Sequence, residues 1–280
     1  MDLRRLKTIF IFILIALNIM FCAVLYNAQN YEKEERLAMT ASLTKLLAKN
    51  MIYLPEKTEL PKSPEIYNFY LEKMFGNNEE LADKLLGKGW SKIDDSQYKS
   101  EEGKLVLDGD EFKFYVKNPS GYIADLSQDT VEKLCRDEMQ RLGIFSELYE
   151  FNGLNFVDEG VRAIFTAGQE EMFFFDGYIS FDVSEKGITS ISGRNMISNL
   201  VASQSDQKFF SITSILPDLI ENPTLKKGVA HTIVSITSGY YIGRTEESYR
   251  NILAIPVWQI ATDSGKILYY DARNGKYIQD

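Results

Sequence analysis

Side chains that commonly perform catalysis are sparse in this sequence. His231 is the only histidine among the 280 residues, which excludes zinc sites built on two histidines. A serine-hydrolase triad would have to use this one imidazole, and no Gly-x-Ser-x-Gly motif accompanies it. Because His231 stands in an apolar, strand-like pattern, we expect a partly buried sheet residue rather than a general base.

Cys135 and the acidic residues offer no better site. Cys135 falls on the apolar stripe of a predicted helix, where a free cysteine behaves as a small hydrophobe. Asp108, Asp110 and Glu111 resemble part of a calcium loop, but the twelfth position holds no glutamate, so we expect a hairpin turn. Among 40 Asp and Glu residues no pair stands out as a glycosidase acid and base. We therefore predict no catalytic, cofactor-binding or metal-binding residue, and a protein that is not an enzyme.

The whole-chain composition restricts the partners. A net charge of -9 and a pI near 4.9 disfavour binding to nucleic acid or to anionic wall polymers. Apolar residues make up 45% of the chain and charged residues 25%, as in an ordinary globular protein. With Cys22 in an apolar N-terminal run and Cys135 in a helix, no internal disulfide is expected.

The N-terminal run predicts a membrane anchor. Ile9–Tyr26 contains eighteen residues without a charge, and a helix of that length spans about 27 Å, close to the thickness of a bilayer's hydrocarbon core. Arg4, Arg5 and Lys7 precede the run, whereas glutamates follow it. By the positive-inside rule, residues 1–8 form a cytoplasmic stub and the C-terminal ectodomain is extracellular.

A cleaved signal peptide is the alternative to a retained anchor. The apolar run is longer than a usual signal core, and Leu25, Tyr26 and Asn27 are large where a cleavage site needs small residues. A lipoprotein signal is disfavoured because Phe21 precedes Cys22. We therefore expect a single-pass membrane protein.

One face of the predicted anchor could contact another helix. Leu14, Asn18, Cys22 and Leu25 share this face by helical spacing, and they are our candidates for a transmembrane interface. The amide of Asn18 could form a hydrogen bond to a neighbouring helix in the membrane. The alternative is a single asparagine that the membrane tolerates.

An α+β ectodomain is predicted after the anchor. Residues 27–63 form a juxtamembrane helix, about Tyr31–Lys49, and a linker at Pro55–Ser63. Three modules follow, each with a helix before an antiparallel meander, at residues 64–121, 122–204 and 205–280.

The first two modules are defined by helix and turn signals. Helices are expected over 64–75 and 79–86, then a hairpin around Asp108-Gly109. The second module begins with a helix from Ser127 to Gly143. Its strands are separated by turn signals at Asn152-Gly153, Gly168, Asp176-Gly177 and Lys186-Gly187.

The third module repeats this order more briefly. A short helix is expected over 213–221, followed by strands at 231–236, 252–261 and 267–271. Residues 173–192 and 253–271 share a strand–turn–strand pattern, which we interpret as an internal duplication.

Both ends of the chain resemble one family. MDLRRLKTIFIFILIALNI at the N-terminus is similar to the opening of YycI proteins, and IPVWQIATDSGKILYYDARNGKYI resembles their C-terminus. The second segment also resembles a PepSY domain in its order of Trp strand, turn and Tyr strand. The middle of the chain resembles the family in element order alone.

This resemblance implies a regulatory function. It implies a membrane protein of Gram-positive-type bacteria with a YycH-like partner, which together modulate the WalK sensor histidine kinase of the WalK/WalR system that controls cell-wall metabolism. The family contributes no catalytic residues, and its contacts would run through the transmembrane helix and the ectodomain. Homo- or heterodimers are both possible. The alternatives are a PepSY-type inhibitor or chaperone of an extracytoplasmic protease and a wall-polymer hydrolase.

Overall fold

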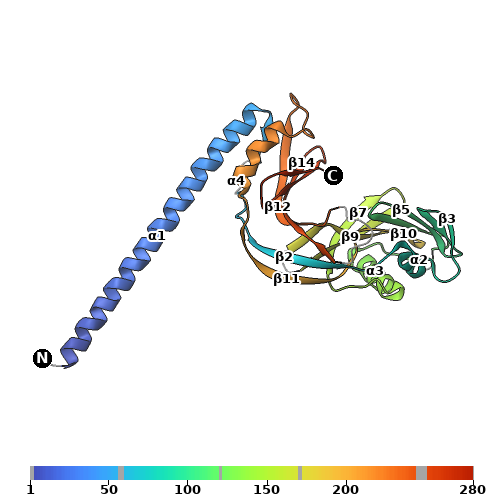
Figure 1. The fold of residues 1–280 in the computed structure, drawn as a ribbon, viewed down its shortest axis with the longest axis horizontal. Helices are drawn as coiled ribbons and strands as arrows, with labels where there is room; N and C mark the ends of the chain where they lie inside the picture. Colours follow the sequence, from blue (N-terminus) through green and yellow to red (C-terminus); the bar gives the residue numbers. More distant parts are fainter. Residues whose placement is uncertain (1–2, 56–59, 120–121, 170–171, 244–250, 280) are drawn as a thin grey trace. The chain divides into compact units, whose positions relative to one another are not determined.

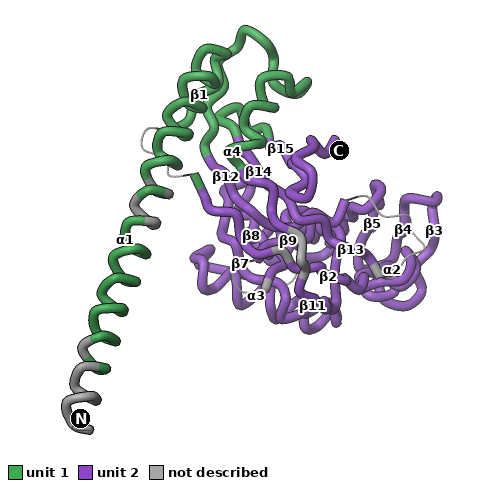
Figure 2. Tube along the Cα trace, turned by 60° about the vertical axis from the view of Figure 1, so that its left-hand side comes forward, with its two compact units in different colours: residues 1–60, 212–234, 262–266 green, residues 61–211, 235–261, 267–280 purple. Residues whose placement is uncertain are grey.

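The computed structural model describes residues 3–55, 60–119, 122–169, 172–243 and 251–279, and it has an α+β fold with a large mixed sheet (Figure 1). The chain forms two compact units (Figure 2). Unit 1 comprises residues 1–60, 212–234 and 262–266, and unit 2 comprises residues 61–211, 235–261 and 267–280.

Unit 1 is built on one long helix. Helix α1 (Leu3–Lys49) runs without interruption, because the first glycine or proline of the sequence is Pro55. Its C-terminal end contacts β1 (Ile52–Tyr53), α4 (Ile212–Ile215) and the short helix η1 (Leu216–Glu221). The buried apolar residues of this unit are Leu43, Leu47, Ile52, Leu60, Ile212, Ile215, Leu216, Leu219, Leu225 and Ile233.

Unit 2 contains two helix–meander modules. The first consists of α2 (Asn78–Leu86), β3 (Ser91–Asp94), β4 (Gln97–Lys99), β5 (Gly103–Asp108) and β6 (Glu111–Val116). The second consists of α3 (Gln128–Leu142), β7 (Tyr149–Val157), β8 (Gly160–Gln169), β9 (Met172–Ser184) and β10 (Gly187–Arg194).

The two meanders join through their last strands. β10 pairs antiparallel with β6, with Ser190 opposite Tyr115, so the order is β7-β8-β9-β10-β6-β5-β4-β3. Each meander therefore covers an edge that the other would leave open.

Further strands extend this sheet and form a second one. The large sheet continues as β9-β12-β14-β15-β16. The bounds are β12 (His231–Tyr241), β14 (Ile255–Thr262), β15 (Ile267–Asp271) and β16 (Tyr277–Ile278). A separate three-stranded sheet has β2 (Glu65–Lys73) between β11 (Ile197–Lys208) and β13 (Asn251–Leu253). Phe69 of β2 packs edge-on against Phe174 and Tyr240, with ring centroids 5.4 Å and 4.7 Å away.

Local sequence explains the two helices of unit 2. Asn77 caps α2 by accepting a 2.8 Å hydrogen bond from the backbone N–H of Glu80. In α3, Val131, Cys135, Met139 and Leu142 are buried, and the left-handed Gly143 ends the helix. These elements confirm the predicted helices at 79–86 and 127–143, and α1 confirms the helix over 31–49.

The predicted helix at 64–75 is wrong, because this segment forms β2. Phe69 and Leu71 are completely buried while Tyr70 is 54% exposed, so burial alternates with a period of two. This alternation, and pairing with β11 and β13, overrides the helix-like composition.

Three predicted turn signals lie within strands, and one of them is Gly168 of β8, which pairs with Phe173 of β9. Asp176-Gly177 lies within the continuous strand β9, where the Asp176 carboxylate is buried and hydrogen-bonded. Asn152-Gly153 lies within β7 at a bulge, and Gly153 has a φ of 130°. The hairpin around Asp108-Gly109 is confirmed by β5 and β6, in which Asp108 pairs with Glu111. The module boundaries and the internal duplication stay predictions.

Candidate functional site

The candidate interface residues of the N-terminal run all lie on α1. Leu14 and Leu25 are 45% and 62% exposed, and Asn18 and Cys22 are exposed as well. The Asn18 side-chain N–H donates a 2.9 Å hydrogen bond to the backbone oxygen of Leu14 one turn earlier. An amide has one oxygen and two N–H groups, so the rest of the Asn18 side chain could serve a neighbouring helix.

The exposed apolar surface of α1 extends along the run. Phe10, Ile13, Ile19, Phe21 and Tyr26 expose between 51% and 66% of their surface. Within the described part of the chain, however, no helix is long and apolar enough to cross a membrane.

The opposite end of α1 is embedded in the core of unit 1. Leu43 is 8% exposed and Leu47 is fully buried. Leu43 follows Leu14 by 29 residues, which is about eight turns at 3.6 residues per turn. The face that carries Leu14 and Asn18 is therefore the face of α1 that packs into unit 1.

The residues considered for catalysis are built into the fold. His231 is 5% exposed, and its Nε2 lies 3.3 Å from the backbone oxygen of Lys226. Cys135 is fully buried in α3, and burial raises the pKa of its thiol far above the usual range, which favours the protonated thiol. The predicted positions of His231 in a strand and of Cys135 on the apolar stripe of a helix are confirmed, and His231 is more deeply buried than expected.

The acidic trio occupies the β5–β6 hairpin, as predicted. Asp110 lies 3.9 Å from the ammonium of Lys73, and Glu111 lies 3.8 Å from the guanidinium of Arg194. Across the described residues, no group of acidic, histidine or cysteine side chains is arranged to hold a metal ion.

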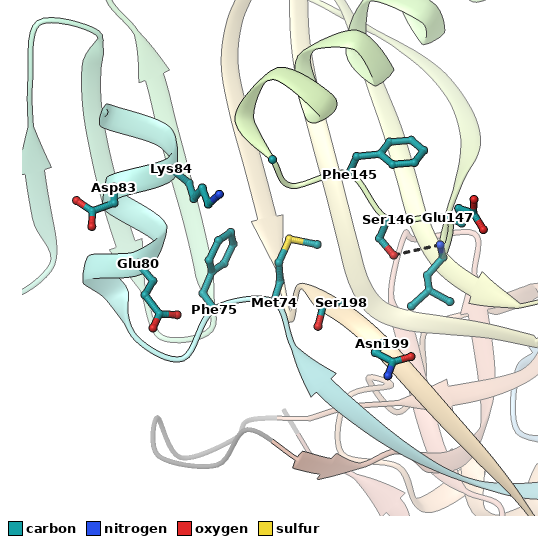
Figure 3. Close-up of a pocket in the computed structure, with 12 residues that line it drawn as sticks. Met74, Phe75, Glu80, Asp83, Lys84, Phe145, Ser146, Glu147, Ser198 and Asn199 are labelled. Carbon is teal, nitrogen blue, oxygen red and sulfur yellow. Dashed lines mark hydrogen bonds between the residues drawn. The ribbon is translucent and has the colours of Figure 1, made fainter. Parts of the chain in front are cut away.

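A pocket of about 870 Å³ lies within unit 2 (Figure 3). It is lined by segments of α2, β11 and two loops, whose lining residues are Met74, Phe75, Glu80, Asp83, Lys84, Gly143, Phe145, Ser146, Glu147, Leu148, Ser198 and Asn199. Figure 3 shows Asp83 and Lys84 on one side and Ser146 and Glu147 on the other, with Met74 between them. The pocket combines apolar and aromatic side chains with three carboxylates and one ammonium.

Three of the four charged side chains of this pocket have a hydrogen-bond partner or lie beside a helix end. Asp83 accepts a 2.7 Å bond from the indole N–H of Trp90, and Glu80 accepts one of 2.7 Å from the backbone N–H of Gly76. A Cβ added to Gly143 would lie 3.0 Å from the Lys84 ammonium, which therefore stands beside the C-terminus of α3. A helix C-terminus favours a cation there.

Sequence reasoning missed this pocket, because its residues come from four separate segments with no local motif. The one available signal was Glu80, Asp83 and Lys84, which lie on one face of α2 at helical spacing.

Comparisons with solved structures find distant similarity. An uncharacterised protein from Eubacterium rectale has 12% identity and a TM-score of 0.45, with 82% of this chain and 91% of that chain covered. The C-terminal domain of Bacillus megaterium YpeB has 9% identity and a TM-score of 0.34, with 72% and 96% covered. Both TM-scores are below 0.5, so neither similarity bears on function. No curated protein matches the chain.

A comparison with family models gives a clear result. The model of the YycI protein family matches residues 32–277, which include the C-terminal end of α1, the rest of unit 1 and nearly all of unit 2. Because this match spans most of the sequence, the chain belongs to the YycI family.

Proposed function

We propose that this protein is a membrane-anchored regulator that modulates a WalK-type sensor histidine kinase, and with it cell-wall metabolism, together with a YycH-like partner. Membership of the YycI family supports this regulatory function. The protein acts by binding the signalling states of the kinase with different affinities.

The observation that carries the proposal is the construction of α1. Its N-terminal part presents a charge-free apolar run with exposed side chains, and its C-terminal part packs into unit 1 through Leu43 and Leu47. One helix thus joins a surface suited to lipid and to other helices with a folded body. The complete run at residues 9–26 and the membrane-anchored character of the family support the anchor.

Replacement of the anchor tests the proposal. Exchanging residues 9–26 for an unrelated apolar span should abolish regulation of the kinase's target genes, while the ectodomain remains folded and at the membrane. Deletion of residues 1–30 should have the same effect on regulation. Unchanged target-gene expression after both changes would contradict the proposal.

A finer test concerns the candidate interface. Asn18→Leu removes a hydrogen-bonding group that contributes about 0.5 to 2 kcal/mol between helices in a membrane, so it should weaken regulation and crosslinking to partner helices. Ala23→Leu is the matched control, because Ala23 follows Leu14 by nine residues, about 2.5 turns, and lies on the opposite face. Equal effects of both substitutions would exclude the proposed face.

A further inference from the structure

Strand β11 lies at an edge of its sheet, and residues 197–204 lack the features that usually block pairing with another chain. In the described structure it pairs with β2 and has no strand on its other side. Residues 197–204 read Ile-Ser-Asn-Leu-Val-Ala-Ser-Gln, with no charge and no proline, and residues 198–204 are exposed or half-buried. Natural edge strands usually carry charges or proline that block pairing with another chain. The charged residues of β11 are Asp206 and Lys208 at its C-terminal end, so residues 197–204 form an uncharged stretch of the edge that another strand could pair with.

The hydrogen bonds of β2 define which peptide groups of β11 point outward. The backbone oxygen of Phe69 accepts a 3.0 Å bond from Ala254, on the side of β2 away from β11. In antiparallel strands the N–H and C=O of one residue point to the same side, and opposing residues alternate between bonded and non-bonded pairs. Ala202, opposite Phe69, therefore directs its N–H and C=O away from β2.

A hydrogen bond of Leu200 independently indicates that its peptide group also points away from β2. Its backbone N–H donates a 2.9 Å bond to the side-chain oxygen of Asn199, not to β2. Leu200 and Ala202 thus form a ladder of outward peptide groups with the two-residue repeat that an added strand requires.

A row of apolar side chains crosses the exposed face of this sheet. Tyr70 of β2 lies opposite Val201 on one side and Leu253 on the other, and these three side chains are 54%, 58% and 44% exposed. A strand added beside β11 would place a side chain next to Val201 and extend this row. That side chain should be apolar.

The pocket adjoins the same strand. Ser198 and Asn199 of β11 line it, and Asn199 lies two residues before Val201. A side chain of the added strand opposite Asn199 would therefore enter the pocket. Glu147 forms no hydrogen bond with the other residues that line the pocket (Figure 3), whereas the Lys84 ammonium lies beside the C-terminal end of α3. Three carboxylates and the aromatic side chains of Phe75 and Phe145 line the pocket, and such a lining suits a basic side chain with an aliphatic stem.

We propose that β11 and the adjoining pocket bind an extended segment of a partner protein, which adds a strand to the sheet and inserts a Lys or Arg side chain into the pocket two residues from an apolar one. This mode of recognition obtains affinity from main-chain hydrogen bonds and specificity from a side-chain pocket. It rests on the proposed regulatory function, for which it defines the ectodomain contact.

Binding of short peptides to the full-length protein in detergent micelles tests the proposal. The probes are capped nine-residue peptides of alternating valine and threonine, with one lysine two residues before or after the central valine, so that both strand directions are covered. The control peptides carry glutamate in place of lysine. Calorimetric titration should show binding of a lysine peptide about tenfold tighter than its glutamate control. Equal affinity for the two would overturn the proposal.

Variants locate the binding to the edge and the pocket. Ala202→Pro removes an outward N–H that β2 does not use, and should weaken lysine-peptide binding about tenfold, whereas Ala202→Thr keeps the N–H and should bind as the wild type. Glu147→Lys should abolish the preference of the protein for the lysine peptide over the glutamate peptide. This substitution changes the pocket and leaves the peptide groups of β11 intact. Unaltered binding in Ala202→Pro and Glu147→Lys would refute the site.

The experiments can contradict the proposed function and the proposed binding site independently of each other. None of these substitutions changes residues 9–26, so loss of regulation on anchor exchange would stand even if no peptide bound. Mass measurement of the micelle-bound protein adds one more outcome. If Ala202→Pro converted a dimer to a monomer and no lysine peptide bound, β11 would pair with a second copy of the chain and the proposal would be overturned.

Discussion

The carboxylate of Asp176 accepts a 2.8 Å hydrogen bond from the side-chain amide of Asn195, and both side chains are buried within unit 2. The same carboxylate accepts bonds of 2.7 Å and 2.8 Å from the backbone N–H groups of Ile242 and Gly243. Asp176 therefore ties the middle of β9 to the ends of β10 and β12. Burial raises the pKa of Asp176 above its ordinary value of 3.8, although the backbone hydrogen bonds oppose this shift.

This pKa predicts a pH dependence of stability. Because the folded protein binds the Asp176 proton more tightly than the unfolded chain, the contribution of this group is fully present below 3.8 and declines as the pH rises through the raised pKa. Asp176→Asn cannot titrate. In urea unfolding from about pH 3 to about pH 7, the wild type should lose unfolding free energy relative to this variant.

Asp158→Asn is the control for this experiment, because Asp158 is exposed in the β7–β8 turn. Its stability should follow that of the wild type at every pH. Parallel curves for the wild type and Asp176→Asn would show that Asp176 does not cause the effect.

Two glycines on the first meander should respond differently to alanine. A Cβ at Gly103 would lie 2.0 Å from the backbone oxygen of Tyr115, so Gly103→Ala should cost about 3 kcal/mol of unfolding free energy. Gly109 has a φ of 60° but open space around it, so Gly109→Ala should cost about 1 kcal/mol through backbone strain alone. Denaturant midpoints measure both, and a larger loss for Gly109→Ala than for Gly103→Ala would show that the clash with Tyr115 is not the dominant cost.

Arg162 and Asp182 form the best-defined ion pair between β8 and β9. They lie directly opposite each other, with 2.6 Å between Nε and Oδ1, and Ser190 donates a 2.7 Å bond to the same carboxylate. Burial alone would raise the pKa of Asp182, but the bonds from Arg162 and Ser190 lower it below 3.8. A double-mutant cycle with Arg162→Met and Asp182→Asn should give a coupling of about 1 kcal/mol at neutral pH, since Arg162 is partly exposed.

The sign of the pH dependence is opposite to that of Asp176. A lowered pKa means that the coupling is present above 3.8 and disappears as the pH falls through the lowered value. A coupling that stayed constant down to about pH 2 would show that the pair is not ionic.

The packing of the C-terminal end of α1 within unit 1 depends more on Leu47 than on its neighbour Leu46. Leu47 is fully buried and Leu46 is 41% exposed. Leu47→Ala should reduce the unfolding free energy by about 3 kcal/mol, whereas Leu46→Ala should change it by less than about 1 kcal/mol. If α1 transmits the regulatory state, Leu47→Ala should also reduce regulation at equal protein levels. Equal stability of the two variants would place the attachment elsewhere.

Sequence patterns predicted the elements whose signals are local. The stripe of Val131, Cys135 and Met139 together with Gly143 defined α3, because a helix and its end depend on neighbours within one turn. The hairpin between β5 and β6 was equally readable from Asp108-Gly109.

Elements that depend on distant partners were not predictable in this way. β2 forms a strand because β11 and β13 lie beside it, and no residue near Phe69 indicates those neighbours. The polar sequence of β11 has no alternating pattern, so the strand was missed. Asp176-Gly177 has the composition of a turn, and only the donors of Ile242 and Gly243, more than sixty residues away, explain an aspartate inside a strand.

The candidate site shows the same division. The apolar face of α1 at Leu14 and Asn18 follows from helical spacing alone and remains a prediction. The pocket between Lys84 and Glu147 requires the packing of α2, α3 and β11, which only the tertiary structure provides.

Helix α1 contains 47 residues without a glycine or proline, which corresponds to a rod about 70 Å long. Such a helix contains no glycine or proline at which a rotation of one end could be absorbed before it reached the other end. A turn or tilt imposed near Leu14 would reach Leu43 with the same sense, since both residues lie on one side of the rod. The helix would then transmit a rotation or tilt of its N-terminal part to unit 1, whereas a flexible linker would not.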